Sequence, residues 1–152
     1  MITRMTDGLT LRMERTYRAP AQAVFDGWTS EEVLRRWFHA GRDWETTEAE
    51  VDLRVGGTVR VVMRHPEADA EYGGGGTYTE IDPPRRLAFT WLWDDVGTRM
   101  LIELDFEEAG GVTTVRFTHR GLWDEDAVRS HESGWTTAFD NLARALGTPR
   151  AR

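Results

Sequence analysis

Two histidines are the residues best suited to acid–base chemistry. His119 stands in a segment where polar and apolar residues alternate, and His131 stands in a later segment with helical periodicity. These patterns put one imidazole on the apolar face of a strand and the other on the apolar face of a helix, so both can reach one cavity. An imidazole can shuttle protons near neutral pH. Alternatively, both are structural and tie the helix to the sheet by hydrogen bonds, because no Asp is placed to orient either ring.

Other catalytic chemistries and metal sites have little support in this sequence. The four histidines, at positions 39, 65, 119 and 131, include no i,i+4 pair and no HExxH motif, so no metal site is expected. The chain has no cysteine, which excludes thiolate ligands, disulfides and cysteine nucleophiles. It also has no lysine that could form a Schiff base. We expect no cofactor.

A second group of candidate residues is aromatic and apolar. Tryptophan offers a large stacking surface and one N–H donor, which suits the wall of a ligand cavity, although the same residues can pack as ordinary core. The expected cavity is lined by Trp28, Trp37, Met63, Phe89, Trp91, Trp93, Met100, Ile102, Phe117, His119, His131, Trp135 and Phe139. Tyr78 and Glu80 share one strand face by alternation, and whether that face points into the cavity stays open.

The elements that would position these residues follow from periodicity. Alternation predicts strands over 9–19, 44–55, 59–63, 77–81, 87–93, 100–106 and 115–119. Short helices are expected over 20–28 and after a cap at Thr29 or Ser30, and a long amphipathic helix over 124–146. Glycines and prolines mark turns at 56–57, 82–85 and 110–111. The glycines at 73–76 predict a flexible edge or bulge, or else leave room for a bulky ligand.

The order of these elements predicts the fold class. Clustered strands, rather than strands alternating with helices, indicate an α+β protein. Only the helix at 124–146 is long enough to cover the sheet. We therefore expect a curved antiparallel sheet of about six to seven strands wrapped around this helix, with two short helices after the first strand. One domain spans 1–152, with its core at 9–146, since 152 residues correspond to about one domain.

Composition and charge exclude several classes of partner. The net charge of −7 disfavours nucleic-acid binding, which needs clustered positive charge. No run approaches the ~18 apolar residues of a membrane span, so membrane insertion is not expected. The first residues have no apolar core and do not form a signal peptide. A cytoplasmic location is expected by default.

Several motifs together resemble a known family. They are Arg18-Ala19-Pro20 with Val24-Phe25, Trp28-Thr29 with Trp37, the run 52–57, the runs 76–81 and 82–87 with Thr90-Trp91, then Thr114, His119, His131, Gly134-Trp135 and Leu142. Their order and spacing resemble the SRPBCC or START-like superfamily, and more closely the activator of heat-shock protein 90 ATPase homologue-like family. The resemblance implies a helix-grip fold with a deep apolar cavity between the sheet and the long helix.

The same resemblance implies a ligand class but not one function. Relatives hold lipids, sterols or polyketides, some are cyclases, and some actinomycete relatives serve antibiotic self-resistance. We expect a small protein that binds an aromatic, polyketide-like or lipid-like molecule, in antibiotic biosynthesis or self-resistance. The alternatives are a cyclase- or hydrolase-type enzyme that uses His119 or His131 in the same cavity, and a cochaperone-like interaction module. We expect no chaperone partner, because the eukaryotic namesake carries a further domain that this sequence lacks.

Overall fold

Seven strands and three helices make up the part of the chain, residues 8–41 and 43–147, that the computed structural model describes. Their order is β1 (Leu9–Tyr17), α1 (Ala21–Thr29), α2 (Glu31–Trp37), β2 (Glu45–Val51), β3 (Thr58–His65), β4 (Ala70–Asp82), β5 (Arg86–Trp93), β6 (Met100–Ala109), β7 (Val112–Leu122) and α3 (Glu125–Ala145). The predicted α+β class and helix-grip arrangement are confirmed. None of the described helices is both long and apolar enough to cross a membrane.

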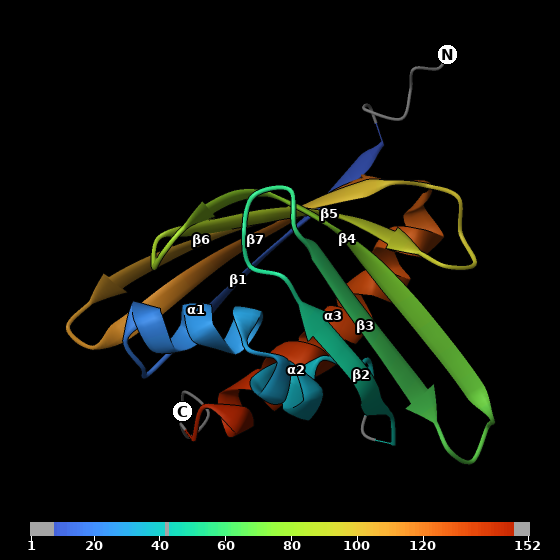
Figure 1. The fold of residues 1–152 in the computed structure, drawn as a ribbon, viewed down its shortest axis with the longest axis horizontal. Helices are drawn as coiled ribbons and strands as arrows, with labels where there is room; N and C mark the ends of the chain where they lie inside the picture. Colours follow the sequence, from blue (N-terminus) through green and yellow to red (C-terminus); the bar gives the residue numbers. More distant parts are fainter. Residues whose placement is uncertain (1–7, 42, 148–152) are drawn as a thin grey trace.

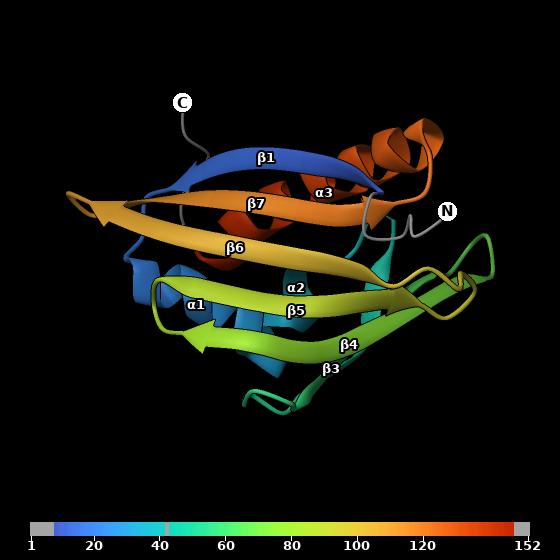
Figure 2. The ribbon, with the colours of Figure 1, turned by 90° about the horizontal axis from the view of Figure 1, so that it is seen from above.

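The sheet is antiparallel throughout, in the order β1-β7-β6-β5-β4-β3-β2. It curves over the three helices, which all lie on its concave side (Figure 1; Figure 2). Because β1 and β2 form opposite edges, α1 and α2 carry the chain from one edge to the other beneath the sheet. The long helix α3 crosses the same concave side, so the apolar faces of the strands and helices meet there.

Local sequence explains where the short helices begin. Ser30 accepts a hydrogen bond from the backbone N–H of Val33 and so caps α2, which settles the predicted choice between Thr29 and Ser30. Acidic residues in the first turn of α2 and arginines in its last turn complement the helix dipole. The start of α1 is capped from the sheet, because the Glu108 carboxylate accepts the N–H of Ala21 at 2.8 Å. The helix α2 ends at Trp37.

The long helix α3 begins as the sequence predicts. The Asp124 side chain accepts the backbone N–H of Ala127 at 2.7 Å. Hydrogen bonds in the second half of α3 then hold the helix against β1 and α2. The Tyr17 hydroxyl donates to the Phe139 carbonyl, and the Asn141 side chain donates to the Trp37 carbonyl. These bonds fix how far α3 lies below the sheet and beside α2.

Aromatic rings fill the space between α1, β7 and the middle of α3. The Trp28 ring lies 4.7 Å from that of Trp37 and 5.9 Å from that of Trp135, measured between centroids. The Trp135 ring lies 4.7 Å from Phe117 and 5.6 Å from Phe139. All five side chains are buried, so this part of the grip is packed with side chains.

Two predictions for the early strands are wrong. The strand expected over 44–55 ends at Val51, and the next residues form a turn in which Leu53 and Val55 are exposed. Residues 52–55 therefore alternate in polarity but do not belong to the sheet. The glycines at 73–76 lie inside β4, between β3 and β5, and do not form a flexible edge.

Tertiary contacts explain those glycines. A Cβ atom on Gly74 would lie 2.8 Å from the Trp91 ring, and one on Gly76 would lie 1.8 Å from the Thr90 carbonyl oxygen. The groups that approach this backbone closely are thus the Trp91 ring and the Thr90 carbonyl, both from the neighbouring strand β5. Glycine permits the close approach because it has no side chain.

A register shift separates Tyr78 from Glu80. The pairing of β4 with β5 is irregular between these residues, so they do not share a face as alternation predicts. Tyr78 is buried and packs against Phe89. Glu80 is exposed and accepts a hydrogen bond from Arg86 at 2.8 Å.

Candidate functional site

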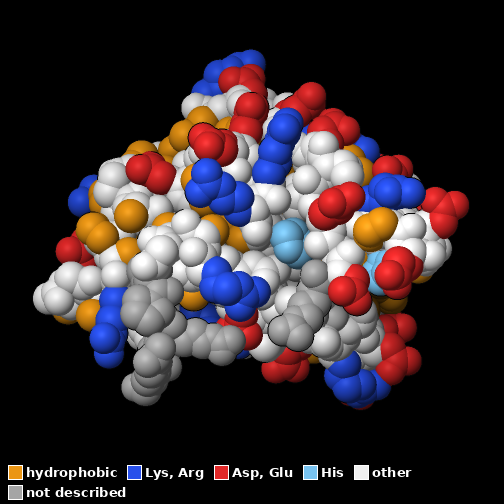
Figure 3. All heavy atoms as spheres, turned by 90° about the horizontal axis from the view of Figure 1, so that it is seen from below, with side chains coloured by type: hydrophobic (Ala, Val, Ile, Leu, Met, Phe, Trp, Pro, Cys, Tyr) orange, Lys and Arg blue, Asp and Glu red, His pale blue; other side chains and the backbone are white. Residues whose placement is uncertain are grey.

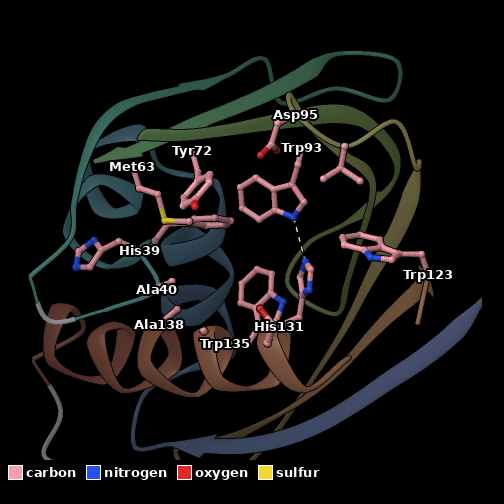
Figure 4. A pocket seen from close by; sticks show the side chains of 14 residues that line it. His39, Ala40, Met63, Tyr72, Trp93, Asp95, Trp123, His131, Trp135 and Ala138 are labelled. Carbon is pink, nitrogen blue, oxygen red and sulfur yellow. Dashed lines mark hydrogen bonds between the residues drawn. The ribbon is translucent and has the colours of Figure 1, made fainter. Parts of the chain in front are cut away.

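A pocket of about 310 Å³ lies between α3 and the ends of β3, β4 and β7 (Figure 4). This volume is at the small end of the range for ligand pockets, roughly 300–1,000 Å³. Its walls are mostly aromatic or apolar. The lining residues are Phe38, His39, Ala40, Met63, Tyr72, Trp93, Asp95, Val96, Trp123, Ser130, His131, Gly134, Trp135 and Ala138.

Small residues on α3 leave the room for this pocket. Ser130, Gly134 and Ala138 stand four residues apart, so they follow one face of the helix, beside His131 and Trp135. A larger side chain at any of the three positions would occupy the space. Trp123 and Tyr72, each 44% exposed, form the outer walls.

The two candidate histidines meet behind this pocket. Their ring centroids are 5.1 Å apart, with the rings nearly perpendicular at 82°. His131 lines the pocket and comes from α3, whereas His119 comes from β7 and is completely buried. The strand and helix periodicities therefore predicted their proximity correctly.

Both nitrogens of His119 are occupied. Its Nδ1 accepts a hydrogen bond from Trp135 Nε1–H at 3.1 Å, which places the ring proton on Nε2. That nitrogen lies 3.2 Å from Met100 Sδ. Burial, and secondarily the neighbouring His131, lower the pKa of His119 to about 3. This ring is neutral at physiological pH.

The nitrogens of His131 are occupied as well. Its Nε2 accepts a hydrogen bond from Trp93 Nε1–H at 3.0 Å, and its Nδ1–H faces the Ala127 carbonyl oxygen at 2.8 Å. Burial lowers the pKa of this imidazole too. Each histidine thus joins α3 to a strand, as the structural alternative predicts: His119 through Trp135, and His131 through Trp93. Figure 4 shows the bond between Trp93 and His131.

Comparison with known proteins places this fold. The family model described as activator of Hsp90 ATPase homolog 1-like protein matches residues 18–147. The chain belongs to this family. No curated protein matches it.

Solved structures share the fold over nearly the whole chain. A protein from Chromobacterium violaceum is 22% identical, with a TM-score of 0.84, over 92% of this chain and 98% of its own. The AHSA1 protein from Silicibacter pomeroyi is 27% identical, with a TM-score of 0.80, over 91% and 98%. An HSP90 activator from Plasmodium falciparum is 21% identical, with a TM-score of 0.74, over 95% and 100%.

In this member of the Hsp90 ATPase activator homolog-like family, the predicted cavity residues divide into two groups. Four of the thirteen line the pocket, namely Met63, Trp93, His131 and Trp135. The other nine do not line it and lie in the buried core: Trp28, Trp37, Phe89, Trp91, Met100, Ile102, Phe117, His119 and Phe139. Tyr78 and Glu80 do not line it either.

Sequence reasoning missed most of the pocket wall. Phe38, His39 and Ala40 follow α2, Tyr72 lies in β4, Asp95 and Val96 follow β5, and Trp123 follows β7. These residues stand at or beyond the ends of elements, where periodicity carries little information. One available signal was the spacing of Ser130, Gly134 and Ala138, small residues on the helix face that also carries Trp135.

Proposed function

We propose that this protein binds a small molecule with an apolar, aromatic body in the pocket beside α3. The observation that carries the proposal is the lining, in which Trp93, Trp123, Trp135, Tyr72 and Phe38 surround one space. Aromatic walls with few polar groups are typical of ligand sites. The pocket volume suits a ligand of two or three fused rings better than a long lipid.

The bonding of the histidines favours binding over catalysis. A general base needs a free lone pair within reach of the substrate. The Nε2 lone pair of His131 faces Trp93, and both nitrogens of His119 face protein atoms. The enzyme alternative, with His119 or His131 as acid or base, would require these bonds to break first.

The face drawn in Figure 3 lends less support to a cochaperone-like module. On the face drawn in Figure 3, arginines and acidic residues are interspersed, and apolar side chains form only small groups. Protein-docking surfaces commonly show a larger contiguous apolar patch. The description of the Plasmodium falciparum structure as an HSP90 activator applies to that protein. A cytoplasmic location and a role in antibiotic biosynthesis or self-resistance stay predictions.

Binding of the neutral fluorescent probe N-phenyl-1-naphthylamine tests the proposal. Wild-type protein should enhance its fluorescence and gain melting temperature by mass action. Trp123→Ala removes an outer wall, and the loss of about 1.4 kcal/mol of apolar contact should weaken binding about tenfold. Val112→Ala is the control, since Val112 is also exposed but does not line the pocket. No binding by wild type, or equal binding by Trp123→Ala, would refute the pocket as the site.

A further inference from the structure

The described lining of the pocket contains one carboxylate, and no described residue pairs with it. Asp95 is the only acidic residue among the described residues that line it. Within residues 8–41 and 43–147, no hydrogen bond or salt bridge engages its side chain. The neighbouring Asp94 differs, because Arg60 holds it with two hydrogen bonds of 2.7 and 2.9 Å. The charge of Asp94 is thus compensated, and that of Asp95 is not.

No other described residue of the lining balances this negative charge. No arginine is among the described residues that form the walls. The two histidines there are His39 and His131, and burial lowers the pKa of both. They are therefore neutral at pH 7. The protein as a whole carries a net charge of −7, which adds to the negative potential.

Aromatic rings lie beside this carboxylate. Asp95, Trp93 and Tyr72 lie on the same side of the pocket (Figure 4). Trp123, whose ring is 5.7 Å from that of His131, forms the wall across from Tyr72. The faces of Trp and Tyr rings attract cations through their quadrupoles. The carboxylate and the ring faces border one space, and both attract a positively charged ligand group.

We propose that the pocket selects organic cations, specifically an ammonium group carried by an aromatic body. This proposal rests on the proposed function and adds the charge of its ligand. The aromatic body lies against Met63, Trp93 and Trp135, and the ammonium group lies at the rim, between Asp95 and the outer rings. An anionic ligand is disfavoured, because it would meet Asp95 with no cation among the described wall residues to offset the repulsion.

Three probes that share a naphthalene body and differ in the charge of one substituent test this selection. They are 1-naphthylmethylamine, which is cationic at pH 7, neutral 1-naphthylmethanol and anionic 1-naphthoate. Binding is measured by isothermal titration calorimetry at low and at physiological salt. The amine should bind about five- to tenfold more tightly than the alcohol, which is what one exposed ion pair and one cation–π contact supply together. The naphthoate should bind more weakly than the alcohol.

Asp95→Asn identifies the source of the preference. It should weaken binding of the amine about three- to fivefold and leave the alcohol unchanged, since only a charge is removed. Asp26→Asn removes the same charge from α1, which contributes no residue to the pocket, and should leave all three affinities as they are. Salt should weaken binding of the amine to wild type more than to Asp95→Asn.

The outcomes separate this inference from the proposed function. If the alcohol binds as tightly as the amine, or the naphthoate binds best, the cation preference is refuted and the pocket remains a binding site. If Asp95→Asn leaves the preference intact, the role of Asp95 is refuted. If neither these probes nor N-phenyl-1-naphthylamine bind, the proposed function fails, and this inference fails with it.

Discussion

Replacing His119 by Gln should make the stability of this protein less sensitive to acid. Burial lowers the pKa of His119 to about 3, whereas the ordinary histidine value is 6.5. Between these pH values the unfolded chain binds a proton at this position and the native protein does not. The free energy of unfolding must therefore fall as the pH falls through this window.

The size of the effect follows from the shift. One proton bound only by the unfolded state changes the free energy of unfolding by about 1.4 kcal/mol per pH unit. With the values of 6.5 and about 3, the contribution of His119 between pH 7 and pH 5 is a loss of about 2 kcal/mol. His131 adds a loss of the same sign, because burial lowers its pKa as well, and it remains in the variant.

Glutamine is the substitution of choice because it can replace the hydrogen bond. Its side-chain oxygen can accept from Trp135 Nε1–H, so the variant does not leave this buried donor unpaired. Phe117→Leu is the matched control. It loosens the same part of β7 and lowers stability at every pH, but it retains His119.

Urea unfolding at pH 5, 6 and 7 measures the difference. Wild type and Phe117→Leu should lose stability in parallel as the pH falls. His119→Gln should lose about 2 kcal/mol less than wild type between pH 7 and pH 5. A variant that loses stability in parallel with wild type would show that His119 is not the buried, neutral imidazole described above.

Four further substitutions test the packing of α3, the close contacts of a glycine and the cap of α3. Trp135→Ala should cost about 3–5 kcal/mol, because the side chain is only 6% exposed, and an unchanged urea midpoint would contradict the packing of α3. Gly76→Ala should cost about 3 kcal/mol or more, since its Cβ would lie 1.8 Å from the Thr90 carbonyl oxygen. Gly97→Ala, with no atom within 4 Å, should stay within about 0.5 kcal/mol of wild type by the same urea measurement, and equal effects would refute the steric argument. Asp124→Ala should lower thermal stability by about 1 kcal/mol through loss of the α3 cap, and an unchanged melting temperature would show that the cap contributes nothing.

Most elements of the fold could be predicted from the sequence because their signals are local. Alternation along β5, β6 and β7 and the period of α3 each lie within one segment, and the structure confirms these elements. The signal failed where alternation had no tertiary partner. Leu53 and Val55 alternate with charged residues but lie in a turn, and the register shift after Tyr78 reverses the face of Glu80. Neither outcome is visible without the neighbouring strand.

The site was predictable only in part, for a related reason. The proximity of His119 and His131 follows from two periodicities and one packing arrangement. The position of the pocket depends on how side chains from distant segments fill the grip. Aromatic residues of α1, β7 and α3 fill its middle, and the space that remains lies at the end bordered by Trp123 and Tyr72.

The sequence by itself determined the class of fold, the family, and the faces on which the tryptophans and histidines lie, because these depend on residue type and spacing along the chain. Only the tertiary structure decided which of those side chains border empty space and which fill the core. It also decided that Trp93 and Trp135 bond to the histidine nitrogens and that no described residue pairs with Asp95. A cavity and a hydrogen bond each depend on atoms that are distant in the chain, so no local pattern can encode them.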